Sequence, residues 1–216
     1  MPTLNAKSKD LKAVSKELKE SLDDQPIEVE NANHLHGFAA GLDHGEVIVT
    51  GNAGDYLGVL NNGANIKVTG DAGNYVADNM TDGTVIIEGN AGYGAGQYCY
   101  GGTVIVRGNA GDFTATMNKG ATILIGRDVG VEVGTYMIAG DLIIIGNAGE
   151  NLANYLIRGN IYIGGEWKSL GNNTRQEALT DEDLAMLGAL FETYKFESNP
   201  TQYKKIVAAS EKPFYK

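Results

Sequence analysis

The chain has little of what disulfide-linked, membrane-spanning and nucleic-acid-binding proteins need. Its single cysteine cannot form an internal disulfide, and no apolar run approaches the roughly 20 residues of a membrane span. The formal charge of -10 and the pI near 4.7 argue against nucleic acid or an anionic membrane surface, because both reward clustered lysine and arginine. The polar start "MPTLNAKSKDLK" lacks the apolar core of a signal peptide. We therefore expect a cytoplasmic protein that binds neither nucleic acid nor membranes.

Patterns that would indicate catalysis are also scarce. None of the six serines lies in a G-x-S-x-G motif, so a stand-alone hydrolase, the enzyme alternative, lacks a visible nucleophile and base. His34, His36 and His44 lie within 11 residues, but their spacing matches no standard zinc pattern. Cys99 falls at a position where other coils carry packed side chains, which indicates a core residue rather than a nucleophile. We expect no catalytic residue, no cofactor site and no metal site.

Proline is absent from the long stretch between Pro26 and Pro200, as continuous β-ladders require. Glycine shows the opposite distribution, since 29 of the 30 glycines lie between Gly37 and Gly171. These sharp boundaries divide the chain into a glycine-rich middle and two glycine-poor ends.

The glycine-poor ends are predicted to be helical. Residues 1–26 carry Leu11, Val14, Leu18 and Leu22 at near-helical spacing among lysines and glutamates, which predicts an amphipathic helix. Residues 172–216 are predicted to form a helical tail, because Thr180 followed by Asp183 resembles a capping box. The apolar residues that follow line one helical face: Leu184, Leu187, Phe191 and Tyr194. Residues 27–171 form the third part.

The stretch "GNAGDYLG" at 51–58 looks at first like a phosphate-binding loop. Its tetrad returns as "GDAG" or "GNAG" at 70, 89, 108 and 146, and each copy leads into another strand rather than a helix. The copies follow a period of 19 residues without gaps, so the glycines belong to a repeating backbone. The second glycine of each tetrad forms a glycine ladder: Gly54, Gly73, Gly92, Gly111, Gly130 and Gly149. Glycine at every copy indicates either positive φ or close approach of two backbones.

Two apolar columns accompany the glycines and mark the inward positions of a short strand in every repeat. The first is Val47, Ile66, Val85, Val104, Ile123, Leu142 and Ile161, and the second is Val49, Val68, Ile87, Val106, Ile125, Ile144 and Ile163. A strand that recurs every 19 residues must pair with its copies above and below. The pattern therefore predicts an all-β solenoid, a parallel β-helix of about seven coils over 27–171, with flanking N- and C-terminal α-helices.

The column between these two should point outward, yet it is apolar except at Lys67. Its apolar members form a candidate docking face: Ile48, Ile86, Ile105, Leu124, Ile143 and Tyr162. Soluble monomers seldom leave such a continuous patch bare. A terminal helix, a partner subunit or a second copy is expected to cover it.

Two further features of the turns have simple structural explanations. A column of Asn or Asp is expected to stack and to hydrogen-bond the backbone: Asn52, Asp71, Asn90, Asn109, Asp128 and Asn147. In the fifth coil, "RDVG" places Arg127 and Asp128 where other coils carry Gly and Asn or Asp. This pair is either a solvated turn or a docking contact.

The tandem pattern G-x-x-G-x-x-x-[GA], as in "GNAGDYLG", "GDAGNYVA" and "GNAGENLA", resembles the GXGXG domain over about residues 31–171. That domain forms the C-terminal right-handed β-helix of glutamate synthase large subunits. A free-standing form occurs in split, glutamate-synthase-like complexes, and a related form is one of the structural subunits of formylmethanofuran dehydrogenase. The stretches "GGEWKSLG", "LTDEDL" and "EKPFYK" are similar to the split form.

The resemblance implies a non-catalytic structural subunit. Its partners would be a class II glutamine amidotransferase subunit and a flavin-containing synthase subunit, with self-association also open. The chemistry of the complex would be glutamine-dependent amination, or the related transfer of a glutamyl or methylamine group. The alternative is a structural role in formylmethanofuran dehydrogenase.

Overall fold

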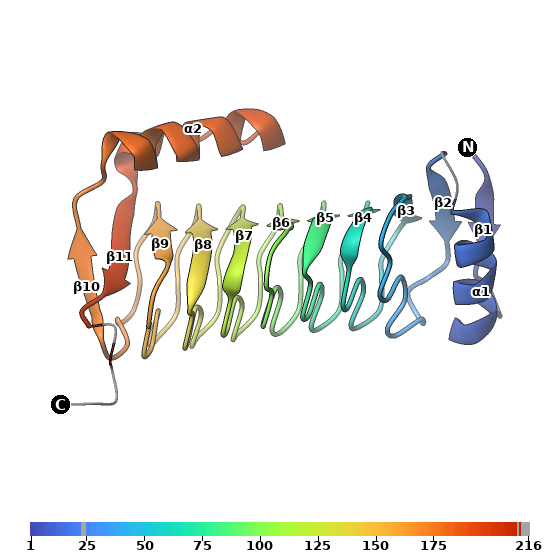
Figure 1. The fold of residues 1–216 in the computed structure, drawn as a ribbon, viewed down its shortest axis with the longest axis horizontal. Coiled ribbons are helices and arrows are strands. Elements are labelled where there is room, and N and C mark those ends of the chain that lie inside the picture. The colour runs from blue at the N-terminus through green and yellow to red at the C-terminus, as the bar shows by residue number, and fades with distance from the viewer. Residues whose placement is uncertain (23–24, 211, 213–216) are drawn as a thin grey trace.

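The computed structural model describes residues 1–22, 25–210 and 212. It is a parallel β-solenoid of about seven turns with two helices, drawn out into a rod (Figure 1). Except for Lys212, the final stretch "EKPFYK" lies outside the described residues.

One strand from each coil contributes to a continuous parallel sheet. The strands are β2 (Ile27–Glu30), β3 (Glu46–Thr50), β4 (Asn62–Val68), β5 (Asp82–Ile87), β6 (Thr103–Val106), β7 (Lys119–Ile125), β8 (Ala139–Ile144) and β9 (Asn160–Ile163). Between β3 and β9 paired residues lie 19 positions apart, as Val47 and Ile66 do, except that Asn62 and Lys119 pair with residues 20 positions later. Both inward columns are buried throughout. The predicted period, strands and core are therefore confirmed.

The N-terminal end of the rod carries one additional strand and the first helix (Figure 1). β1 (Thr3–Asn5) pairs in parallel with β2 and was not predicted. α1 (Leu11–Ser21) is the predicted amphipathic helix, and Val14 and Leu18 on its apolar face are buried. The Asp10 side chain caps it by accepting a hydrogen bond from the amide of Ala13 at 2.8 Å.

The C-terminal end contains more sheet than the sequence suggested. It comprises β10 (Thr174–Glu177), α2 (Asp181–Tyr194), the 3₁₀ turn η1 (Pro200–Gln202) and β11 (Lys204–Ala208). The capping box of α2 is confirmed, but the expectation of a purely helical tail is corrected, since β11 pairs antiparallel with β9 and β10 pairs with β11. A bare last coil would expose a row of unpaired backbone groups, which these strands cover. Neither described helix has the length and apolar composition needed to cross a bilayer.

The glycine ladder is explained by close approach rather than by backbone conformation. None of its six glycines has positive φ. At Gly111 an added Cβ would lie 2.9 Å from the carbonyl carbon and oxygen of Gly92 in the preceding coil. The amide of Gly111 donates to that same carbonyl at 3.1 Å. Of the two alternatives that the sequence left open, the structure selects backbone contact.

The Asn and Asp column forms a second ladder along the turns. The Asn90 side-chain oxygen accepts from the amide of Asn109 at 2.9 Å, and Asn109 accepts from the amide of Asp128 at 3.1 Å. Asp128 in turn accepts from the amide of Asn147 at 2.7 Å. The stacked polar side chains therefore form hydrogen bonds from coil to coil. The "RDVG" coil differs in sequence, but its Asp128 continues the ladder. The neighbouring Arg127 is exposed.

Replacing Gly111 with valine is expected to lower the free energy of unfolding by about 1–3 kcal/mol. The added atoms would meet the backbone of the coil below, which cannot move without breaking its own ladder. Gly188→Val is the matched control, because the nearest atom to a Cβ there is 3.9 Å away, and we expect a change below about 0.5 kcal/mol. Urea unfolding measures both. An unchanged midpoint for Gly111→Val would show that the coils can separate at no cost.

Candidate interaction surface

Helix α2 covers most of the candidate docking face. It runs along the rod over β9 to β6 (Figure 1). Its buried side chains Leu187 and Phe191 join Tyr203 in a second hydrophobic core. The four covered residues of the face are Ile105, Leu124, Ile143 and Tyr162, each at most 1% exposed. Of the covers that the sequence left open, a terminal helix therefore occupies these four positions, and they are not free to bind a partner.

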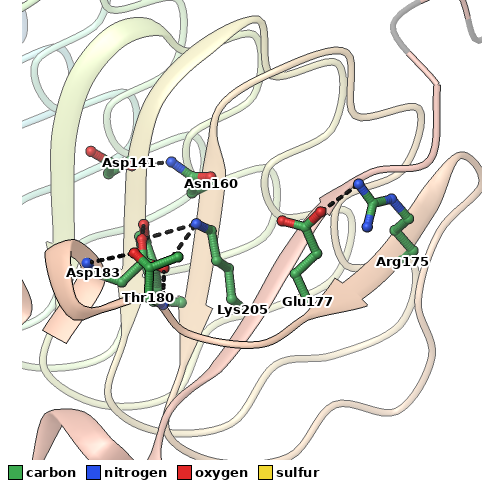
Figure 2. Close-up of polar contacts among 8 residues, drawn as sticks. Asp141, Asn160, Arg175, Glu177, Thr180, Asp183 and Lys205 are labelled. Atoms are coloured by element: carbon green, nitrogen blue, oxygen red, sulfur yellow. Dashed lines mark hydrogen bonds and ion pairs between the residues drawn. The ribbon is translucent and has the colours of Figure 1, made fainter.

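A buried polar cluster fixes the beginning of α2 to the sheet. Lys205 Nζ lies 2.9 Å from both carboxylate oxygens of Asp183, and the Tyr162 hydroxyl donates to Asp183 at 2.6 Å. Figure 2 shows Lys205 reaching Asp183 beside Thr180, whose amide also donates to the carboxylate at 2.8 Å. These bonds connect α2 with β9 and β11.

The cluster shifts the pKa values of its members. Burial alone would raise the pKa of Asp183, but the hydrogen bonds from Thr180, Tyr162 and Lys205 outweigh it and hold the pKa at about 2. Burial, and then the hydrogen bond to Asp183, raise the pKa of Tyr162. The carboxylate is therefore ionised and fully used as an acceptor, as expected of a structural ion pair.

Beyond the end of α2 the candidate face continues as a shallow groove. Ile86 lines a groove of about 280 Å³ over β3 to β5 together with Tyr194 of α2, and both Ile48 and Ile86 are half-buried. Lys67 lies in the same groove and pairs with Glu88 at 2.9 Å. Only Ile48 and Ile86 therefore remain as docking candidates from the original set.

A second surface was not anticipated from the sequence. We define the turn face as the segments 55–60, 74–79, 93–98, 112–117, 131–136 and 150–155, which follow one another along the rod. Aromatic residues on it adopt positive φ, for example Tyr56 at 57° and Tyr136 at 55°. Positive φ is rare for bulky residues, so propensity did not point to this surface. The signal available was the 19-residue spacing of Tyr56 and Tyr75 and of Tyr136 and Tyr155.

The sequence model of the GXGXG motif family matches residues 28–208. The chain belongs to this family. The GXGXG match runs from β2 to the end of β11, so it includes α2 and β10 as well as the coils. Membership is consistent with the glutamate-synthase-related domain that the sequence resembles. No curated protein matches the chain.

The three histidines of this GXGXG chain have separate partners. His34 Nε2 lies 3.0 Å from the carbonyl of Lys9, whereas His36 Nδ1 accepts from the amide of Asp55 at 3.1 Å. His44 hydrogen-bonds the aspartate that precedes it. Across the part of the chain that the structure describes, no three His, Cys, Asp or Glu side chains are grouped to hold a metal ion.

Cys99 lies in the core. It is fully buried, and its Sγ donates to the carbonyl of Ala77 at 3.0 Å. Burial raises the pKa of the thiol to about 12. The packed position of Cys99 is the one that the repeat predicted, and the thiol stays protonated near neutral pH.

Proposed function

We propose that the chain is a non-catalytic scaffold subunit of a glutamate-synthase-like oxidoreductase complex. It would hold a class II glutamine amidotransferase subunit and a flavin-containing synthase subunit in register. The observation that supports this proposal is the GXGXG match over the whole solenoid and its C-terminal cap, residues 28–208.

The architecture suits such a role. In the described part of the chain, an 11-stranded sheet held by coil-to-coil ladders makes a rigid rod, on which two bound proteins would keep a fixed separation. The chain's buried reactive groups are engaged in packing, since Cys99 lies in the core and Asp183 is paired with Lys205. The chain would hold the partner subunits at a fixed separation, while glutamine-dependent amination would take place on those subunits.

Purification of the tagged chain from its native cells tests the proposal. We expect mass spectrometry to identify a glutamine amidotransferase and a flavoprotein that co-elute, with a flavin absorption spectrum in the complex. Co-elution with a molybdenum or tungsten enzyme would instead favour the formylmethanofuran dehydrogenase role. Elution alone, or only as a dimer of itself, would contradict the proposed assembly.

Reconstitution without this chain separates scaffolding from catalysis. Glutaminase activity and ammonia-dependent amination should persist on the partners, whereas glutamine-dependent amination should fall by about tenfold or more because the two sites are no longer held together. Loss of glutaminase activity itself would show that the chain contributes to catalysis. Unchanged glutamine-dependent amination would show that the scaffold is dispensable.

A further inference from the structure

The turn face combines aromatic rings with carboxylates and contains no lysine or arginine. Its aromatic residues are Tyr56, Tyr75, Tyr93, Tyr98, Phe113, Tyr136 and Tyr155. Its acidic residues are Asp55, Asp78, Asp112, Glu132 and Glu150.

The rings contact one another from coil to coil. The ring centroids of Tyr56 and Tyr75 are 4.8 Å apart, those of Tyr75 and Tyr93 are 5.4 Å apart, and those of Tyr93 and Phe113 are 4.9 Å apart. A second row places Tyr136 and Tyr155 at 5.6 Å. Tyr56, Tyr93 and Tyr136 remain 37–40% exposed. The ladder of coils thus presents rigid aromatic rows to solvent.

The carboxylates are held beside these rows. One oxygen of Asp112 accepts from the amide of Val131 at 2.8 Å, which fixes the side chain against the turn. Glu132 accepts from Thr135 at 3.0 Å and from the side chain of Asn151 at 2.8 Å. Fixed acids beside ring faces create a surface of negative potential without paired lysine or arginine on the same segments.

The chain already places one cation at the rim of this surface. Lys119 Nζ lies 4.0 Å from the ring centroid of Tyr100 and 5.7 Å from that of Tyr98, and it donates to the Tyr100 hydroxyl at 2.8 Å. Cation–π attraction of this kind strengthens when water is excluded. The rim therefore shows the type of group that the surface accommodates.

We propose that the turn face is the docking surface for an arginine-bearing segment of a partner protein. A guanidinium group can lie against an aromatic ring and bond a carboxylate with two N–H groups at once, which an ammonium group cannot. This docking proposal depends on the proposed scaffold function in one respect, which is the identity of the protein that carries the arginine-bearing segment. The surface chemistry is independent of that identity.

Binding of synthetic peptides to the purified full chain tests the surface directly. We expect octaarginine to bind about fivefold more tightly than octalysine in calorimetric titrations at physiological salt, and octaglutamate not to bind. Tyr93→Ser should weaken octaarginine binding about fivefold, because the ring lies at the centre of the longer row. Glu46→Gln is the control, since Glu46 is an exposed acid on β3, outside the turn face, and its loss should change affinity less than twofold.

Each outcome decides the proposal. Equal affinity for the two cationic peptides, with no effect of Tyr93→Ser, would mean that the net charge alone attracts them, and this result would overturn the proposal. Absence of octaarginine binding would also overturn the proposal. If Tyr93→Ser lowers the melting temperature, Tyr136→Asn replaces it, because Asn tolerates positive φ at that position. The assay needs no partner, so a failed co-purification leaves its result intact, and a failed peptide titration leaves the scaffold role intact.

Discussion

Ile105→Lys is expected to lower the free energy of unfolding by about 3–5 kcal/mol. Ile105 is 0% exposed and lies beneath α2 in the core that contains Leu187 and Phe191. A lysine at this position must either lose its hydration among apolar side chains or push the helix away from β6. The first outcome costs the desolvation of a charge, and the second exposes apolar area that was buried. Urea unfolding followed by circular dichroism measures the loss.

Ile48→Lys is the matched control for this prediction. Ile48 occupies the same column two coils beyond Ile86, where α2 no longer covers the sheet, and it is half-buried. A lysine there can extend its ammonium group to water, so we expect a loss below about 1 kcal/mol. Equal losses for the two variants would show that α2 adds nothing to the stability of the face it covers.

The repeating part of the fold could be predicted because the same sequence pattern recurs in every coil. Val47 and Val49 alone would suggest only a short strand, but their copies at 19-residue intervals fix the pairing, the register and the core. The capping box at Thr180 and Asp183 likewise fixed the start of α2. Local rules and tertiary structure agree at these positions.

The position of α2 could not be predicted, because it depends on contacts between segments far apart in sequence. The helix pattern showed that Leu187 and Phe191 face a hydrophobic partner, but not which one. What places α2 on β9 to β6 is β11, which brings Lys205 to Asp183, and no local signal in the tail indicated that strand. The sequence therefore identified the face as apolar and named a terminal helix among its possible covers, but it did not show which helix covers it or how much of it.

The turn face could not be predicted from the sequence, for a different reason. Alanine and tyrosine occupy positive φ in its segments, as at Ala77 with φ 58° and Tyr155 with φ 53°, where propensity favours glycine or asparagine. The backbone bonds between coils hold these residues in place, for example from the amide of Ala77 to the carbonyl of Leu57 at 2.8 Å. Tertiary contacts therefore maintain a backbone conformation that local propensity disfavours.

Asp183→Asn is expected to cost about 3 kcal/mol. The Asn side chain keeps one acceptor oxygen, so it can accept from Thr180 or from Tyr162 but not from both, and Lys205, only 9% exposed, would keep its charge without a carboxylate beside it. The double variant Asp183→Asn with Lys205→Met removes both charges and should recover part of the loss, since an apolar side chain suits the buried site. A double variant that is less stable than Asp183→Asn would show that Lys205 contributes through contacts other than this ion pair.

The same carboxylate predicts how stability depends on pH. Asp183 has a pKa of about 2 in the folded chain, against an ordinary value of 3.8 that applies once the chain unfolds. The unfolded state therefore binds a proton at a higher pH than the folded state, so acid favours unfolding through this group. Its contribution to the free energy of unfolding is about 2 kcal/mol. This contribution is complete above about pH 5, declines as the pH falls through 3.8 and is lost below about pH 2.

Urea unfolding of the wild-type chain and of Asp183→Asn from pH 7 to pH 2 isolates the contribution of Asp183, because the other acids are common to both. The difference between the two free energies of unfolding should shrink by that amount as the pH falls, whereas a constant difference would mean that Asp183 keeps an ordinary pKa and that the cluster owes its stability to packing rather than to charge.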